Sequence, residues 1–170
     1  MPDPRKKFSH IYDRYINKIY KFVFFKVNSQ ETAEDLTSEA FSRTWVVFKE
    51  KQGEIRNVRA FLYKIANNLV IDHYRQKGRV NIVSVNNPSV PTIVDPSQDL
   101  EKHVLLNSDM GEVRQALLLL KEDYQNVVIW HYLDDLSISE ISGILNRSKQ
   151  ATRVLLHRAL KALKNKIEQV

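Results

Sequence analysis

The stretch that decides the fold is LSISEISGILNRSKQATRVLLHRALKAL, residues 136–163. Its apolar residues recur at three- and four-residue steps, the period of an amphipathic helix, and Asn146 and Arg147 interrupt the pattern. Ser137 or Ser139 can cap the first helix, and Ser137 with Glu140 three residues later is typical of a capping box. Ser148 can begin a second helix. We therefore expect a short helix, a tight turn and a longer helix.

Positive charge is concentrated on the second of these helices. Residues 141–170 hold seven Lys or Arg against one acid, whereas residues 109–140 hold two against seven. When about 100° is allowed for each residue, the basic and polar side chains lie opposite the apolar ones. A helix-turn-helix with this division can place its second helix in the major groove of DNA. The alternative interpretation is an ordinary amphipathic helix with a solvated basic face.

Within a major groove, the first residues of such a helix face the bases and its flanks face phosphates. We expect base contacts from Lys149, Gln150 and Arg153. We expect phosphate contacts from Arg147, Arg158 and Lys161.

The composition excludes several other classes of protein. The 170 residues carry a net charge of +6 and contain no Cys, which removes disulfides, thiolate zinc sites and Cys nucleophiles. Only four Gly are present, and no phosphate-binding loop or nucleophile elbow occurs. The five His have no metal-ligand spacing, and no signal peptide or membrane-spanning stretch is visible. We expect no catalytic residues, no metal or other cofactor, no small-molecule substrate and no membrane insertion.

The rest of the chain is predicted to be helical, with one interruption. Apolar residues repeat with helical spacing from Phe8 onward, with a break at Asn28. Ser29 can cap a second helix, with Thr32 as an alternative start. A third helix is expected from about Val58 to Gln76, with Gly78 as its stop. β-prone residues and prolines then predict an extended linker, after which helices resume, one of them over residues 124–133. The sequence thus predicts an all-α fold of two small helical domains joined by that linker.

Two surfaces of the first domain stand out. Residues 1–79 hold sixteen bases and nine acids, and the third helix carries Asn, Lys and Arg opposite its apolar stripe. Such side chains can contact bases and phosphates, although a bundle with a solvated polar face is the plainer alternative. The second helix instead carries a small acidic strip, which DNA would repel, so a protein partner suits it better. Solvation of acids near a helix N-terminus is the alternative there.

Three of these segments, in this order, resemble the bacterial sigma factors of the extracytoplasmic-function (ECF) group of the sigma-70 family. AEDLTSEAFSRTW, residues 33–45, resembles the helix that binds core polymerase. RAFLYKIANNLVIDHYRQKGR, residues 59–79, resembles the helix for the −10 promoter element. Residues 136–163 resemble the helix-turn-helix for the −35 element.

The resemblance implies a promoter-specificity subunit that binds core RNA polymerase, recognises the −35 and −10 elements and helps to open the promoter. It implies a sigma-2 domain over residues 8–79, a linker over 80–108 and a sigma-4 domain over 109–168. The implied partners are the β′ clamp helices and β flap of the polymerase, promoter DNA and an anti-sigma factor. The implied location is the cytoplasm, at the nucleoid when the chain is in holoenzyme. The acids of the linker, Asp95, Asp99 and Glu101, would lie near the path of nascent RNA.

The resemblance also assigns site residues. It implies core-polymerase binding by Asp35, Ser38, Glu39 and Ser42. It implies −10 DNA binding by Arg56, Arg59, Lys64, Asn67, Asn68 and Arg75, with a flipped base captured by the loop 51–57. It implies −35 DNA binding by Arg147, Ser148, Lys149, Gln150, Arg153, His157 and Arg158.

The main alternative is a stand-alone helix-turn-helix transcriptional regulator, which would bind its duplex alone and often as a dimer. The sequence shows neither coiled-coil heptads nor a ligand-pocket signature to support that alternative. A helical adaptor without a nucleic-acid role would suit the acidic strip but not the basic C-terminal helix.

Overall fold

The computed structural model describes residues 3–51, 55–83 and 109–169. These residues form helices, with no strand among them, so the predicted all-α class is confirmed. The chain divides into two compact units, with α1, α2 and α3 in the first and the later helices in the second.

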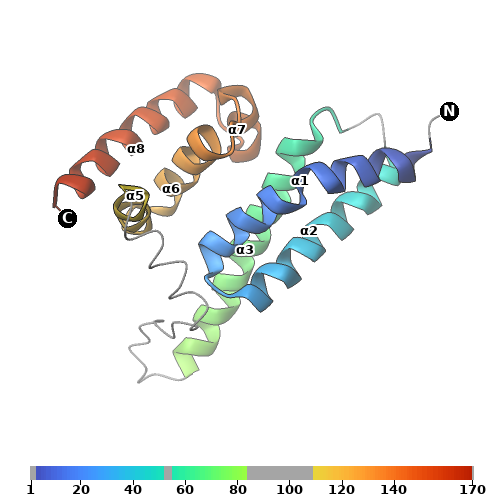
Figure 1. Cartoon of the computed structure of the whole chain (residues 1–170), viewed down its shortest axis with the longest axis horizontal. Coiled ribbons are helices and arrows are strands. Elements are labelled where there is room, and N and C mark those ends of the chain that lie inside the picture. The colour runs from blue at the N-terminus through green and yellow to red at the C-terminus, as the bar shows by residue number, and fades with distance from the viewer. Residues whose placement is uncertain (1–2, 52–54, 84–108, 170) are drawn as a thin grey trace. The chain divides into compact units, whose positions relative to one another are not determined.

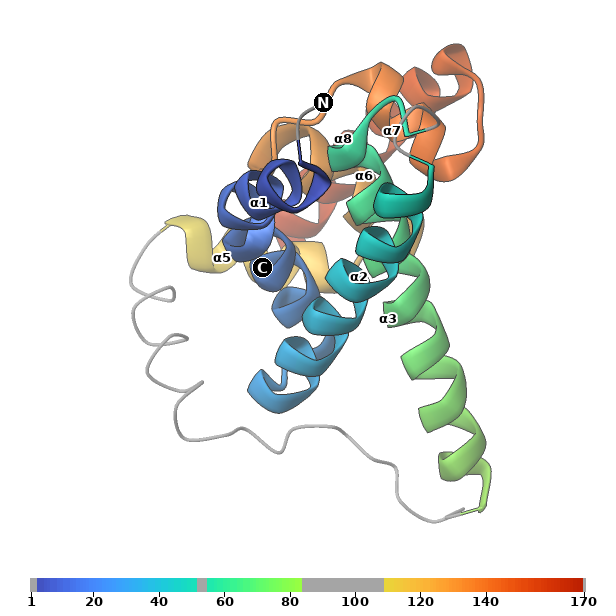
Figure 2. The same cartoon turned by 90° about the vertical axis from the view of Figure 1, so that its right-hand side faces the viewer.

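The first unit is a bundle of three helices, α1 (Pro4–Val27), α2 (Gln30–Glu50) and α3 (Val58–Val83), each of which contacts the other two (Figure 1). Its core is apolar and includes Ile19, Val23, Leu62, Ala66 and Val70, all fully buried. Figure 2 shows the same three helices side by side from a second direction. Burial of this shared apolar face stabilises all three helices together.

Local residues set the ends of the first two helices. Asp3 accepts a hydrogen bond from the backbone N–H of Arg5, so α1 begins earlier than the expected Phe8. Asn28 then adopts a left-handed conformation with φ of 54° and ends α1. The Ser29 hydroxyl accepts from the N–H of Thr32 and caps α2, as predicted. A left-handed residue followed by a capping serine turns the chain sharply between α1 and α2.

The third helix is longer than expected. Gly78 does not stop it, because α3 continues to Val83 and no described glycine has a positive φ. A glycine inside a helix costs only about 1 kcal/mol relative to alanine, which its neighbours in a continuous helix can offset. The first residues of the expected extended linker are therefore helical, and residues 84–108, with their three acids, lie outside the described part.

The second unit consists of α5 (Asp109–Leu118), α6 (Glu122–Val128), the short π-helix η1 (Ile129–Leu133), α7 (Ile138–Leu145) and α8 (Lys149–Gln169). The last helix packs against α5, α6 and α7 (Figure 1). Trp130, Leu136 and Ile141 lie at most 1 % exposed in the core.

The helix expected over residues 124–133 is divided between α6 and the π-turn of η1, which the sequence pattern did not indicate. Two hydrogen bonds end the wider turn. The N–H of Asp134 donates to the Ile129 carbonyl, and the N–H of Leu136 donates to the Trp130 carbonyl. These bonds satisfy carbonyls at the end of the helix and direct the chain toward α7.

Candidate nucleic-acid and protein interfaces

The helix-turn-helix is built by local hydrogen bonds at three positions. At the start of α7, the Ser137 hydroxyl accepts from the N–H of Glu140, and the Glu140 carboxylate accepts from the N–H of Ser137. Asn146 is left-handed, with φ of 53°, and ends α7. The Ser148 hydroxyl then accepts from the N–H of Ala151 at 3.0 Å and caps α8. The predicted capping box, turn and second cap are all confirmed.

The two faces of α8 separate as expected. Thr152, Leu155, Leu156, Ala159 and Leu163 are buried against the rest of the unit. The predicted −35 residues are all exposed: Arg147, Ser148, Lys149, Gln150, Arg153, His157 and Arg158. This arrangement leaves a continuous cationic surface along one helix, which is suited to phosphates and base edges.

One of these cations is already engaged. The Arg147 guanidinium donates to the Asp123 carboxylate at 3.1 Å, across 24 positions of sequence. Both side chains are roughly half-exposed, so the pair contributes about 0–1 kcal/mol to stability. Arg147 therefore also braces the turn before α8 against the start of α6.

One exposed residue of α8 was missed at the sequence level. Val154 is 45 % exposed although its side chain is apolar, and it lies on the cationic side of the helix. The same helical spacing that separated the basic from the apolar residues places it there. The charge pattern of the sequence does not distinguish it, because Val154 is apolar.

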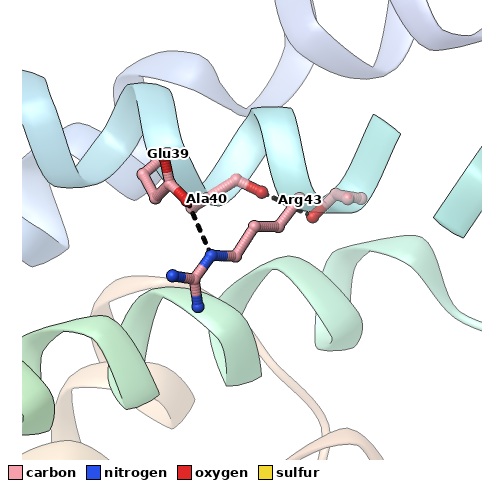
Figure 3. A network of polar contacts seen from close by, with 4 residues as sticks. Glu39, Ala40 and Arg43 are labelled. Carbon is pink, nitrogen blue, oxygen red and sulfur yellow. Dashed lines mark hydrogen bonds and ion pairs between the residues drawn. The ribbon is translucent and has the colours of Figure 1, made fainter. Parts of the chain in front are cut away.

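The acidic strip on α2 is exposed as well. Asp35, Ser38, Glu39 and Ser42 all lie on the surface of the first unit. The Arg43 side chain donates to the Glu39 carboxylate at 2.7 Å, one helical turn away (Figure 3). Inside the same helix, the Thr44 hydroxyl donates to the Ala40 carbonyl at 2.7 Å. Glu39 is thus partly neutralised, while an ion pair this exposed contributes little to stability.

An aromatic groove of about 770 Å³ lies between α1 and α2, next to this strip. Ser38 and Ser42 belong both to the strip and to the wall of the groove. Its rings pack closely, with centroids of Phe8 and Trp45 at 5.1 Å. The remaining lining residues are Arg5, Ser9, Tyr12, Ile16, Asn17, Tyr20, Glu34, Thr37 and Phe41. A protein surface that reaches the polar strip would therefore also meet an apolar hollow.

The expected −10 residues, which lie on α3 and just before it, are not all exposed. Arg56, Lys64, Asn68 and Arg75 are exposed and Arg59 is half-buried. Asn67, however, is only 8 % exposed, which corrects its placement on the polar face. Asn67 lies one position beyond the buried Ala66 and packs within the bundle. Residues 52–54 of the expected −10 loop lie outside the described part.

The end of α3 is held to α1 by a long-range hydrogen bond. The Tyr74 hydroxyl donates to the Lys26 carbonyl, although the ring remains 44 % exposed. Beside it, His73 is half-buried, and desolvation together with the positive charge of Lys77 lowers the pKa of His73. His73 is therefore a partly packed, neutral ring at ordinary pH.

The described residues show neither a membrane-length apolar helix nor a cluster of three potential metal ligands.

Comparison with known proteins assigns both units. The family model for sigma-70 region 2 matches residues 11–80, and that for sigma-70 region 4 matches residues 110–163. The chain is 31 % identical over 163 residues to the RNA polymerase sigma factor YlaC of Bacillus subtilis, a match covering 94 % of this chain and 91 % of that protein. It is 28 % identical over 156 residues to the ECF RNA polymerase sigma factor BldN of Streptomyces coelicolor. That match covers 92 % of this chain but 58 % of BldN.

A solved structure has the same fold. It is the sigma factor RpoE of Bartonella quintana, determined in complex with the anti-sigma factor NepR. The TM-score is 0.76 at 18 % identity, and the alignment covers 96 % of this chain and 98 % of that one. One assignment follows from the two family regions matched in order and from a relative above 30 % identity, and the common fold agrees with it. The chain belongs to the sigma-70 family of RNA polymerase sigma factors, in its ECF group, whose members are promoter-specificity subunits of bacterial RNA polymerase.

Proposed function

We propose that the two units divide promoter recognition between them, with the boundaries that the sequence predicts. The sigma-2 domain (residues 8–79) binds core polymerase and the −10 element, and the sigma-4 domain (residues 109–168) binds the −35 element. The linker expected over residues 80–108 joins the two, and its first residues, up to Val83, continue α3. The observation that carries the proposal is the capped helix-turn-helix whose second helix presents exposed Lys149, Gln150 and Arg153 at its start.

In the sigma-4 domain, we assign base contacts to those three residues and phosphate contacts to Arg158 and Lys161. Ser148 and His157 flank them on the exposed face. Arg147 contributes to DNA binding by exchanging Asp123 for a phosphate. Recognition of base edges gives this unit its sequence preference, and the phosphate contacts fix its register.

In the sigma-2 domain, the strip of Asp35, Ser38, Glu39 and Ser42 binds the β′ clamp helices. The strip is exposed, acidic and continuous with the aromatic groove between α1 and α2, features that support a protein partner with a basic and apolar surface. Reversing the charge of Glu39 tests this assignment.

For the −10 element, Lys64, Asn68 and Arg75 supply polar contacts to an unpaired strand, and Arg56 and Arg59 hold the backbone at the start of α3. Extrusion of a base costs a few kcal/mol, which stacking and pocket contacts must offset. Asn67 acts from inside the bundle, where its burial allows it to position α3 rather than to touch a base.

Partners and location follow from this role. The chain acts in the cytoplasm, at the nucleoid when in holoenzyme, and rests on the β flap through its sigma-4 domain. An anti-sigma factor holds it inactive by covering these surfaces. The similar sigma factor RpoE was determined in complex with the anti-sigma factor NepR, which supports a partner of this class. The chain carries out no catalysis of its own, and the polymerase supplies the reaction.

A run-off transcription assay with purified core polymerase tests the proposal. Promoter-dependent transcripts that require the chain support it, and loss of transcription when either unit's surface is altered assigns the roles. Tight, sequence-selective binding of the chain to DNA without any response to polymerase would favour the stand-alone regulator instead.

A further inference from the structure

The exposed Val154 occupies an unusual position on α8. Its side chain is 45 % exposed. Thr152 and Leu155, which are close to it in sequence but belong to the core-facing stripe, are buried. Among the large apolar side chains that are exposed in the described part of the chain, Val154 alone lies on α8. It does not contribute to the core of the unit, so packing does not account for a branched apolar residue there.

The neighbours of Val154 place it in the middle of the expected DNA surface. Gln150 lies one helical turn before it and Arg158 one turn after it, and residues four apart on a helix share a face. His157, three residues later, lies on the same face, and all three are exposed. Val154 is the sixth residue of α8 and hence in its second turn, close to the end of a recognition helix that enters the major groove.

The chemistry of the major groove offers one apolar feature that suits such a side chain. Thymine carries a C5-methyl group there, and apolar side chains recognise thymine by contact with it. Gln150 and Arg153 can form hydrogen bonds with base edges, but neither distinguishes a methyl group from a hydrogen. A two-methyl side chain on the same face can do so, because methyl–methyl contact removes both groups from water.

We propose that Val154 is a specificity-determining residue that recognises one thymine of the −35 element through its C5-methyl group. This inference rests on the proposed function of α8 as the −35 recognition helix. It adds a base preference that the charged residues of the helix do not supply.

The test replaces thymine by deoxyuridine, which keeps base pairing and the O4 acceptor and removes only the methyl group. Holoenzyme formed from core polymerase and the full chain first selects its −35 element from a promoter library randomised over that element. Each thymine of the selected duplex is then replaced singly, and the affinity of holoenzyme for each promoter is measured. We expect one replacement to weaken binding about fourfold, the scale of burying one methyl group.

Holoenzyme with the Val154→Ala variant should bind the thymine promoter more weakly by a similar factor. Its affinity should not change further when deoxyuridine replaces thymine at that position. Val154→Ile, which keeps both apolar branches, should restore the preference. Val46→Ala is a matched control, since Val46 is 48 % exposed on α2 in the other unit, and it should keep the full thymine-to-deoxyuridine ratio.

The possible outcomes distinguish a failure of the proposed function of α8 from a failure of the proposed role of Val154. If the library yields no preferred −35 sequence, the proposed function of α8 fails and this inference fails with it. If a −35 sequence is selected but no thymine is methyl-sensitive, or Val154→Ala keeps the sensitivity, only the role of Val154 is overturned.

Discussion

The guanidinium of Arg147 and the carboxylate of Asp123 lie 3.1 Å apart, so the turn that enters α8 is joined to the first turn of α6. Arg147, which is expected to bind a phosphate, is thus paired with an acid of the same chain in the free protein. If Arg147 binds a phosphate as proposed, it exchanges one anion for the other, and Asp123 competes with the phosphate backbone.

Asp123→Asn should release Arg147 and strengthen DNA binding. Because Arg147 of the parent reaches the same phosphate after leaving Asp123, the slope of log affinity against log salt should stay close to the parent value. The affinity itself should rise by up to about fivefold, the equivalent of an exposed ion pair of about 1 kcal/mol that no longer has to be broken. Loss of the exposed pair should lower the free energy of unfolding by less than about 1 kcal/mol. Glu122→Gln makes the same charge change at the neighbouring exposed position without releasing Arg147. An equal rise in affinity for the two variants would remove Arg147 from the DNA interface.

Glu39→Lys should weaken binding to core polymerase at least tenfold, or about 1.4 kcal/mol, because it reverses a charge in the middle of the acidic strip. The introduced lysine and Arg43 would be two cations one turn apart, which should destabilise α2 by only about 0.5 kcal/mol. Binding of the full chain to duplex DNA should not fall. Glu168→Lys at the end of α8 supplies the same net charge change, and fluorescence anisotropy of labelled chain with core enzyme compares the two. Unchanged affinity in Glu39→Lys would show that the clamp helices bind elsewhere.

Ser137→Ala should cost about 1 kcal/mol, because it removes the side-chain acceptor of the capping box that starts α7. For a unit of this size the midpoint of thermal unfolding should fall by about 4–8 °C. The chain contains two tryptophans, Trp45 in the first unit and Trp130 in the core of the second, so a Trp45→Phe background lets fluorescence report on the second unit. Ser139→Ala, at the other serine that could have capped α7, should change the midpoint little. Equal losses in both variants would contradict the observed cap.

The stability of the first unit should depend on the protonation of His73. Burial and Lys77 lower the pKa of His73 in the folded state below the 6.5 expected for an unfolded chain. The unfolded state therefore binds a proton first as the pH falls, and the free energy of unfolding decreases from about pH 6.5 down to the folded pKa. His73→Gln should flatten this part of the pH profile, and Lys77→Gln should reduce it. Denaturant unfolding at pH 7.5 and 5.5 measures the difference; a parent-like drop in His73→Gln would assign it to another group.

Features set by adjacent residues were predictable from the sequence. Ser29, Ser137, Asn146 and Ser148 each act within four residues of their own position. Capping chemistry therefore predicted the starts of α2, α7 and α8 to within a few residues, and the turn that ends α7. The division of α8 into a buried and a cationic face follows equally from helical spacing. These elements carry the candidate DNA surface, which is why most of it could be recognised in advance.

Features that depend on tertiary packing were not predictable. Gly78 lies in a helix that continues past it, because the cost of one glycine is smaller than the gain from an unbroken α3. The burial of Asn67 depends on where α1 and α2 pack, and the Arg147–Asp123 pair joins residues 24 positions apart. The π-turn at η1 widens the helix without any Gly or Pro to signal it.

The account depends most directly on whether this chain directs core RNA polymerase to a promoter. The decisive measurement maps transcript start sites made in vitro by core enzyme with and without the purified chain on a pool of bacterial promoter fragments. The account predicts transcripts that appear only with the chain and share two upstream elements separated by a constant spacer. Start sites that are identical with and without the chain would contradict it.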